Sequence, residues 1–452
     1  MVVRLALQKR DKVVIIFRNF GNMFRIPELR KKLLFTLGVL IVYRVGTYIP
    51  VIGVNVNKLH EFMQQASKLS GLLSYLDVFS GGALGQCTLF ALGIMPYITA
   101  SIMMQILGFT IPEFEQLLKE GEYGRKVINQ YTKYLALALS VVWGFIYVGG
   151  LESYGLIVDP GWVFRFLFVL SLSAGSMAVM WLGDQISLFG VGSGGSMIIF
   201  AGIVAKFPDY VIKTIHAVQT AKLDTIIAFF ILFFFIAVTA CIIFLEKGER
   251  KIPVQYARRI VGNRVFGGQS TYIPFKINNA SIMPVIFASS ILGVPRGIAG
   301  MLANKYKFFS LVTQKLVDTG FLFNALQFVL IVFFYYIYTA LVFNPTELAD
   351  NIKKSGGFVP NVRPGKNTAE FFDFVLTRLG LVGAMYLGIL AILPNVLSAM
   401  VTMPFQLGGT ALLIVVGVGL ETSSQIESYL IERNYEGFLT SGRIKSIKGN
   451  NR

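Results

Sequence analysis

Ten long apolar runs constrain what this chain can fold into more than any other feature of its sequence. They lie near residues 33–52, 88–109, 134–152, 162–182, 195–213, 225–245, 279–299, 321–342, 374–394 and 405–421. A helix of about 20 mostly apolar residues crosses the hydrocarbon core of a bilayer. Because the runs do not alternate between apolar and polar residues, they exclude a β-barrel. The sequence therefore predicts an all-α polytopic membrane protein with ten transmembrane helices.

The composition agrees with a membrane protein and offers little to an enzyme or a metal site. Of the 452 residues 54% are hydrophobic and only 14% are charged, against about 25% charged in an average soluble domain. The two cysteines, Cys87 and Cys241, lie in apolar segments, and the two histidines lie far apart at positions 60 and 216. This pattern predicts no disulfide framework, no metal site and no cofactor. The N-terminal apolar run 13–17 is shorter than the core of a signal peptide, so we expect no cleaved signal.

The distribution of lysine and arginine predicts the orientation of the chain. An even number of spans places both termini on one side of the membrane. Segments 1–32, 110–133, 246–276, 344–378 and 422–452, on the side of the termini, carry 30 basic residues, and segments 53–70, 150–161, 206–224 and 295–320 carry 9. Because cytoplasmic loops are enriched in Lys and Arg, both termini are predicted to be cytoplasmic.

Two cytoplasmic loops are longer than orientation requires. Loop 246–276 interleaves β-favouring residues with Lys and Arg around a Gly-Asn turn, which predicts a projecting basic hairpin. Loop 344–373 is rich in Pro and Gly, which predicts a structured excursion instead of a continued helix. Basic protrusions suit polyanions such as ribosomal RNA, or an acidic protein face. The residues alone leave both kinds of partner open.

Several long strings of the chain resemble a known family. They include "SGGALGQCTLFALGIMPYITASIMMQ", "EGEYGRKVINQYTKY", "MIIFAGIVA", "IFASSI" and "FFYYIYTALVFNPTELADNIKKSGGFVPNVRPGKNT". From about Arg30 to Tyr435 the chain resembles SecY, the central subunit of the bacterial Sec protein translocon. The resemblance implies two inverted five-helix halves around a central hourglass pore. Residues 1–220 would form the N-terminal half, and residues 221–452 the C-terminal half.

The resemblance implies a ring of aliphatic side chains at the waist of the pore. Its members here would be Ile94, Ile98, Ile199, Ile286 and Ile414. The first two are four residues apart and therefore share one helical face. The family often has a sixth aliphatic residue where this chain has Gly195, so the ring would be incomplete or filled by a neighbour such as Met197.

A re-entrant plug is implied within segment 72–87. Its named residues are Leu72, Leu73, Ser74, Tyr75, Leu76, Asp77, Val78, Phe79, Ser80, Gly81 and Gly82. The Gly81-Gly82 pair and Asp77 make this segment a poor membrane span but a plausible helix in a water-filled funnel. Gly93 and Pro96 would mark the change of direction into the next span. The alternative is an extracytoplasmic loop helix without a gating role.

A lateral gate and a set of partner-binding arginines are implied as well. Thr99 and Ser101 on the second span, with Asn278 at the start of the seventh, match positions that line the gate. In the third span, where the family usually has a polar residue, this chain has Trp143, with Ser140 nearby. The cytosolic contacts would come from Arg258, Arg259 and Arg264 on the hairpin and from Arg363 in "NVRPGK".

The implied function is a passive protein-conducting channel in the bacterial inner membrane, with the thylakoid membrane as the alternative location. It would translocate unfolded secretory proteins and release membrane segments laterally. The implied partners are SecE and SecG subunits, the SecA motor, the ribosome, signal sequences, unfolded substrate proteins and membrane lipid. Because the chain lacks a GxxxxGK phosphate loop, its energy would come from these partners.

Two other classes of function are weighed against the channel. A secondary transporter also uses inverted repeats and broken helices, but it needs ionisable residues near the midplane, and span 225–245 carries no charge. A membrane enzyme would need a nucleophile, a base or metal ligands in one place, which two separated histidines do not supply. Arg44, the most intramembrane charge, is interpreted as a structural residue that faces the interior of the bundle. Ion-gradient-driven uptake of a small solute would identify a transporter.

Overall fold

The structure is a computed structural model of the chain, and it describes residues 26–54, 80–153, 155, 157, 161–220, 223–256, 259–261, 264–266, 270–302, 309, 320–401 and 408–448. The helices are α2 (Pro27–Gly46), α5 (Met95–Thr110), α6 (Pro112–Lys119), α7 (Glu122–Ser153), α8 (Trp162–Phe189), α9 (Gly194–Val204), α10 (Phe207–Gln219), α11 (Thr225–Glu246), α12 (Met283–Leu302), α14 (Phe321–Val342), α15 (Pro345–Lys354), α16 (Lys366–Met400) and α17 (Gly409–Lys448). The strands are β1 (Glu249–Tyr256), β2 (Arg259–Val261), β3 (Arg264–Phe266), β4 (Ser270–Lys276) and β5 (Gly357–Phe358).

A helix lies on each of the ten predicted apolar runs, so the prediction of a polytopic helical membrane protein is confirmed. Within the described residues, seven helical segments are long and apolar enough to cross a membrane. α12 falls short because only Met283–Gly293 of it is counted, and α5 falls short because it has only 16 residues. α2 falls short because basic residues occupy both ends of that helix. The total of ten spans therefore stays a prediction.

Two breaks in the helices have local causes. α5 begins at Met95 and not at residue 88, because Gly93 has a left-handed φ of 53° and Pro96 stands in the first helical turn. This is the change of direction predicted from the same two residues. The fifth apolar run is divided into α9 and α10, and Pro208 stands in the first turn of α10. Proline fixes its own φ and has no N–H to donate, so it suits this position.

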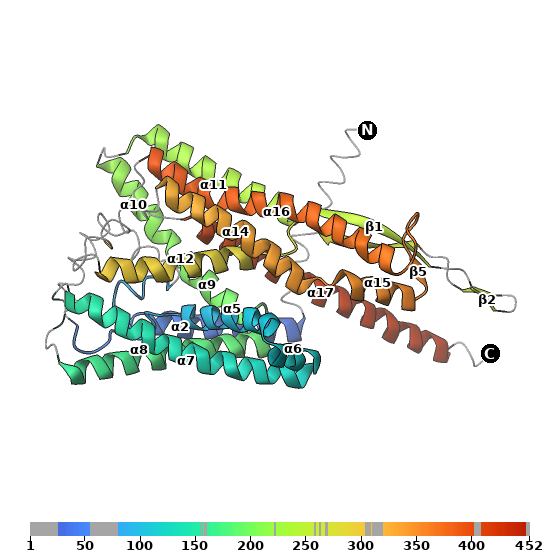
Figure 1. Cartoon of the computed structure of the whole chain (residues 1–452), viewed down its shortest axis with the longest axis horizontal. Helices are drawn as coiled ribbons and strands as arrows, with labels where there is room; N and C mark the ends of the chain where they lie inside the picture. Colours follow the sequence, from blue (N-terminus) through green and yellow to red (C-terminus); the bar gives the residue numbers. More distant parts are fainter. Residues whose placement is uncertain are drawn as a thin grey trace.

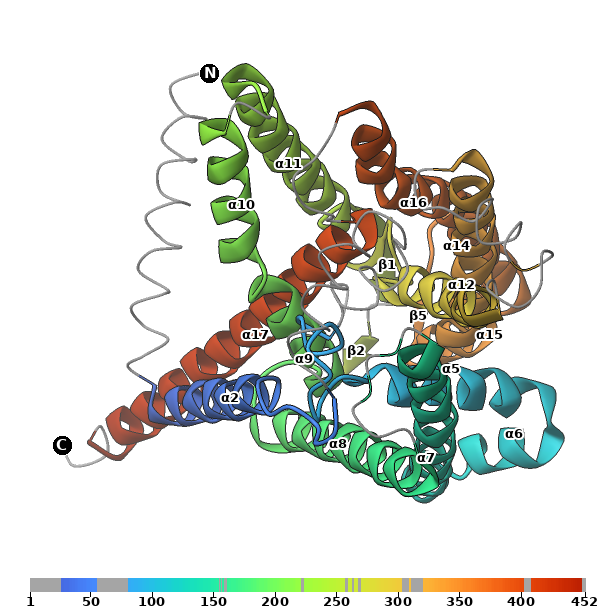
Figure 2. The ribbon, with the colours of Figure 1, turned by 90° about the vertical axis from the view of Figure 1, so that its left-hand side faces the viewer.

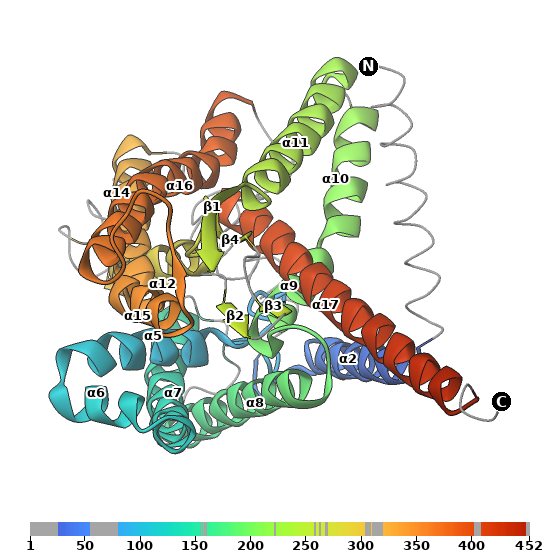
Figure 3. The same cartoon turned by 90° about the vertical axis from the view of Figure 1, so that its right-hand side faces the viewer.

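The helices run mostly along the long axis of the molecule (Figure 1). Viewed along that axis, α2, α5, α7 and α8 lie on one side and α11, α14 and α16 on the other (Figure 2). α17 crosses between the two groups (Figure 3) and contacts both α9 and α16. Outward faces remain apolar, as in α11, where Phe229, Phe233 and Phe244 are exposed. Such faces suit contact with lipid tails. The inverted relation of the two halves stays a prediction.

The described parts of the two long loops, 246–276 and 344–373, fold into one unit at one end of the molecule, which we call the platform (Figure 1). β1 pairs with β4 in an antiparallel hairpin, and β2 pairs with β3 beyond it. β5, from the other loop, pairs with β1 through Gln255 opposite Phe358. Val254 and Phe275 from the hairpin are fully buried against Phe372 of α16. The predicted hairpin and structured excursion are both confirmed, and the structure adds that they share one core.

Candidate pore and gate

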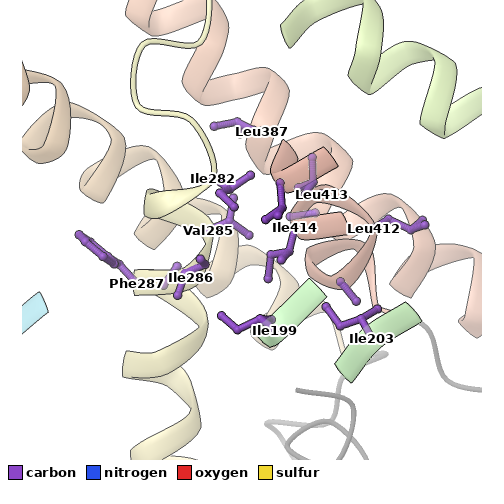
Figure 4. Close-up of a cluster of buried hydrophobic side chains, with 14 of the residues drawn as sticks. Ile199, Ile203, Ile282, Val285, Ile286, Phe287, Leu387, Leu412, Leu413 and Ile414 are labelled. Atoms are coloured by element: carbon purple, nitrogen blue, oxygen red, sulfur yellow. The ribbon is translucent and has the colours of Figure 1, made fainter. Parts of the chain in front are cut away.

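The isoleucines predicted at the waist come together from separate parts of the chain. Ile199 lies on α9, Ile286 on α12 and Ile414 on α17, and all three belong to one buried apolar cluster (Figure 4). Ile94, the residue before α5, belongs to the same cluster, and Ile98 packs against it partly buried. The exposed fractions of the four buried side chains do not exceed 4%. Residues from both ends of the sequence therefore meet in one buried apolar cluster.

The side chain of Ile94 lies over Gly195, the ring position that has no side chain. A Cβ added at Gly195 would lie 3.5 Å from Ile94 Cδ1, and one added at Gly183 of α8 would lie 3.4 Å from the same methyl group. Ile94 thus fills the space that the two glycines leave. Met197, suggested by the sequence as one neighbour that could fill the ring, is also buried in the cluster, and its sulfur accepts from Thr422 Oγ1 at 3.5 Å.

Residues 80–88, which follow most of the predicted plug, form a series of tight turns. Ser80 caps the turn through Leu84 N–H, which donates to Ser80 Oγ at 3.1 Å. Gly81 and Gly82 both have positive φ, which favours glycine over any residue with a side chain. Val51 N–H donates to Cys87 O at 3.0 Å and joins the far end of the turns to the segment after α2. Leu72 to Phe79 lie outside the described residues.

The predicted gate residues hydrogen-bond on their own sides of the seam. α12 contacts both α5 and α7, as a gate between these helices requires. On α5, Thr99 Oγ1 donates to Met95 O at 3.0 Å, and Ser101 Oγ accepts from Gln105 Nε2 at 3.3 Å. On the opposite side, Asn278 Nδ2 donates to Glu246 and to Ser281 O. The assignment of the three residues to a gate stays a prediction, and the structure adds their hydrogen-bond partners.

Glu246, the last residue of α11, is a functional candidate that the sequence reasoning missed. Its Oε2 accepts from Asn278 Nδ2 at 2.8 Å, and Asn278 is 2% exposed. Nearby, Tyr335 OH of α14 donates to Ile277 O at 3.0 Å. These bonds join the start of the seventh span to the sixth and eighth spans. A glutamate at the end of an otherwise uncharged run was the signal available in the sequence.

In the third predicted span, Ser140 and Trp143 make no hydrogen bond with each other or with the gate residues Thr99, Ser101 and Asn278 among the described residues. Ser140 is fully buried and donates to Leu137 O at 2.7 Å within its own helix. Trp143 is partly buried and packs against a second apolar cluster that includes Cys87 and Phe168. Neither residue therefore replaces the polar gate residue that the family pattern places there.

Three of the predicted partner-binding arginines, Arg259, Arg264 and Arg363, lie on the platform. Arg259 is the first residue of β2 and pairs with Phe266, and Arg264 is the first residue of β3 and pairs with Val261. Arg363 has an exposed side chain, and its backbone oxygen accepts from Thr368 Oγ1 at 2.8 Å. Arg258 lies outside the described residues. The arginines that are described therefore belong to a folded platform and not to isolated loops.

The cluster that contains the waist isoleucines is apolar and uncharged. Among the described residues, no side chain that is fully buried carries a charge. Within the same part of the chain, no group of three or more His, Cys, Asp or Glu residues could hold a metal ion. Described ion pairs lie outside this cluster, such as Lys133 Nζ of α7 to Asp184 Oδ2 of α8 at 2.6 Å. The arrangement can exclude water and ions, and it offers no group that would react with a substrate.

The comparison with protein families decides which family this is. The model of the SecY family matches residues 88–423. This chain belongs to the SecY family. Two curated relatives agree: the protein translocase subunit SecY of Streptomyces coelicolor is 45% identical over 436 residues, covering 93% of this chain and 99% of the relative. The protein translocase subunit SecY of Aquifex aeolicus is 41% identical over 424 residues, covering 92% of this chain and 98% of the relative.

Solved SecY-type structures share the fold. A structure described as that of a protein-conducting channel has a TM-score of 0.62 and 19% identity, covering 90% of this chain and 96% of that chain. A structure on the plug domain of the SecY protein and the closed state of its channel has a TM-score of 0.61, 19% identity and the same coverage. Sec61 in a canine ribosome-channel complex has a TM-score of 0.57 and 18% identity, again covering 90% and 96%.

Proposed function

We propose that this SecY-family chain forms the channel of a protein translocase, through which unfolded secretory proteins cross the membrane and hydrophobic segments pass sideways into lipid. The observation that carries the proposal is the convergence of Ile94, Ile199, Ile286 and Ile414 in one buried cluster. An apolar constriction of this kind holds back ions because it excludes water. Aliphatic side chains that make no directional bonds can also separate around a passing chain.

The channel is passive in this proposal. A transporter couples its substrate to an ion through buried ionisable groups, and the described residues contain no fully buried charge. The names of the relatives, protein translocase subunits, support the same function. The energy for movement therefore comes from partners that push or synthesise the substrate.

The site roles follow from the family pattern and are part of the proposal. The five isoleucines form the seal, residues 72–82 form the plug, and Thr99, Ser101 and Asn278 line the lateral gate. In a structurally similar SecY protein, the plug domain stabilises the closed state of the translocation channel. The contact of α12 with α5 and α7 gives the gate its seam.

The partners are proposed from the cytoplasmic platform. One structural neighbour is Sec61 in a ribosome-channel complex, and the basic residues Arg258, Arg259, Arg264 and Arg363 suit the phosphates of ribosomal RNA. We place the SecA motor on the same platform, with SecE and SecG as companion subunits. The chain would lie in the bacterial inner membrane, with both termini in the cytoplasm.

The decisive experiment is reconstitution. The chain, co-purified with its bound subunits in mild detergent, is placed in lipid vesicles with a motor ATPase and a secretory precursor. Protease-protected precursor that depends on ATP and on a functional signal sequence is the expected result. Gradient-driven uptake of small solutes without any protected precursor would overturn the proposal and favour a transporter.

A further inference from the structure

The turn formed by Ser80, Gly81 and Gly82 is fastened to the end of α2 by two neighbouring side chains. Arg44 Nη1 donates to Gly81 O at 2.8 Å. Tyr43 OH, on a side chain that is 1% exposed, donates to Ser80 O at 3.4 Å. Consecutive residues of α2 therefore hold consecutive carbonyls of the turn.

Arg44 is itself held in place by its own helix end. Its Nη2 donates to Tyr48 OH at 3.0 Å, and its guanidinium carbon lies 4.9 Å from the centre of the Tyr48 ring. Nη1 also reaches Thr47 Oγ1 at 3.4 Å. A guanidinium offers five donors in a rigid plane, and here several of them are occupied. Arg44 thus reaches the turn from a fixed position.

The turn rests directly on the helix that carries part of the waist. A Cβ added at Gly81 would lie 2.9 Å from Gly202 Cα, so the two backbones are in close contact. Gly202 belongs to α9 and lies three residues after Ile199, which is in the waist cluster. Ile203, the next residue, is fully buried in the same cluster (Figure 4). The turn and the seal are therefore parts of one packed unit.

We propose that Arg44 is a positioning residue that anchors the Ser80–Gly82 turn on α9 and thereby supports the closed state of the idle channel. The inference rests on the proposed channel function and adds a residue to it. The carbonyl of Gly81 can accept the hydrogen bond from the Arg44 guanidinium only while the turn lies against α9. Loss of the anchor releases the turn, removes support below the waist and lets ions pass when no substrate is present.

The native cysteine at the end of the turns reports on the anchor. Cys87 is 1% exposed, whereas Cys241 is exposed and is first replaced in a Cys241→Ser background. The full chain in membrane vesicles is treated with a maleimide, and the labelling rate of Cys87 measures how often the turns open. Arg44→Met keeps an apolar stem and removes every donor. We expect it to raise the labelling rate about tenfold, the effect of losing one hydrogen bond to a charged group, and to raise idle conductance in planar bilayers.

A second arginine provides a matched control. Arg165 lies near the start of α8, as Arg44 lies near the end of α2. It donates twice to Glu152, at 2.7 and 2.8 Å, and its guanidinium carbon lies 5.0 Å from the Trp162 ring centre. These partners belong to α7 and α8 and not to the Ser80–Gly82 turn. Arg165→Met removes the same kind of donors, and we expect Cys87 labelling and idle conductance to stay at the parent level.

Gly81→Ala disturbs the contact between the turn and α9 from the side of the turn. A methyl group there would meet Gly202 Cα and impose a left-handed φ of 67° on alanine, so it should reproduce the effects of Arg44→Met. If Arg44→Met does not insert, Arg44→Lys, which keeps the charge and loses the planar fork, is measured in its place and should show a smaller rise.

Three results would overturn the anchor: unchanged Cys87 labelling in the Arg44 variant, an equal rise in Arg165→Met, or increased labelling with unchanged idle conductance. Failure of the parent chain to translocate any precursor would instead refute the proposed function. The labelling experiment does not need translocation, so the two failures are distinguishable.

Discussion

Two neighbouring glycines at the start of α9 should respond to alanine in opposite ways. A Cβ at Gly194 would lie 1.8 Å from Gly183 O and 2.6 Å from Gly183 C, both atoms of the α8 backbone. A Cβ at Gly195 would meet only Ile94 Cδ1, at 3.5 Å, which is an ordinary van der Waals contact. Alanine at Gly194 therefore tests the close packing of α9 on α8, and alanine at Gly195 tests the contact of that position with Ile94.

The magnitudes follow from these contacts. Gly194→Ala forces two helices apart, and overpacking of this kind costs about 1 to 3 kcal/mol. The shift also weakens the bond from Gly194 N–H to Ser187 Oγ, at 2.9 Å, which is worth about 1 kcal/mol. Gly195→Ala removes a glycine from a helix, which gains up to about 0.5 to 1 kcal/mol, and less in the first turn. We expect Gly194→Ala to lower the free energy of unfolding by about 2 to 4 kcal/mol, and we expect Gly195→Ala to change it little.

The assay is thermal unfolding of the purified chain with its bound subunits in detergent, at one scan rate because such unfolding is generally irreversible. Gly194→Ala should lower the midpoint clearly, and Gly195→Ala should match or slightly exceed the parent. Idle conductance of Gly195→Ala should also match the parent, since Ile94 already covers that position. Equal destabilisation by the two variants would refute the described packing of α9 on α8 and of Ile94 on Gly195.

Three further predictions concern the seal, the platform and its core. Replacing Ile286 and Ile98 with Asn should raise resting conductance in planar bilayers, because amides let water into the constriction; unchanged current with normal insertion would mean that they do not line the pore. Arg363→Glu should reduce motor-driven translocation without lowering abundance, because its side chain is exposed, and a parallel fall in abundance would make Arg363 structural. Phe275→Ala should destabilise the platform by about 3 to 5 kcal/mol, because Phe275 is fully buried with its ring centre 5.6 Å from that of Phe372. Limited proteolysis should then cut loops 246–276 and 344–373 faster than in Phe275→Leu, and equal cutting would contradict the shared core.

Local patterns in the sequence predicted the parts of the fold that depend on neighbouring residues. Apolar runs predict spans because the bilayer requires about 20 apolar residues in a helix. Gly93 and Pro96 predicted the start of α5 because both act on their own backbone. The hairpin of loop 246–276 followed from β-favouring residues on both sides of a turn. In each case the cause and the effect lie within a few residues of one another.

Contacts between distant residues could not be predicted in the same way. The pairing of β5 with β1 joins residues about a hundred positions apart, and neither strand encodes its partner. The contact of Ile94 with the Gly195 position depends on how the residue before α5 lies against α9. Closeness in sequence suggested Met197 as the neighbour of Gly195 and could not reveal Ile94. Arg44 was identified as an interior residue, but its partner, Gly81 O, is a backbone atom that any sequence supplies.

The hydrogen bonds of Thr99 and Asn278 would allow the proposed gate to be closed and still separable. Thr99 is satisfied by Met95 O of its own helix, and Asn278 by Glu246 of the adjoining span. Parting α5 from α12 therefore breaks neither of these bonds. The apolar contacts between the two helices can be exchanged for contacts with lipid tails, since membranes provide no hydrophobic force between helices. In the proposed channel, a seam of this kind would resist a substrate only weakly, so we expect the barrier that keeps the idle channel closed to lie mainly at the isoleucine cluster and at the turn packed against α9.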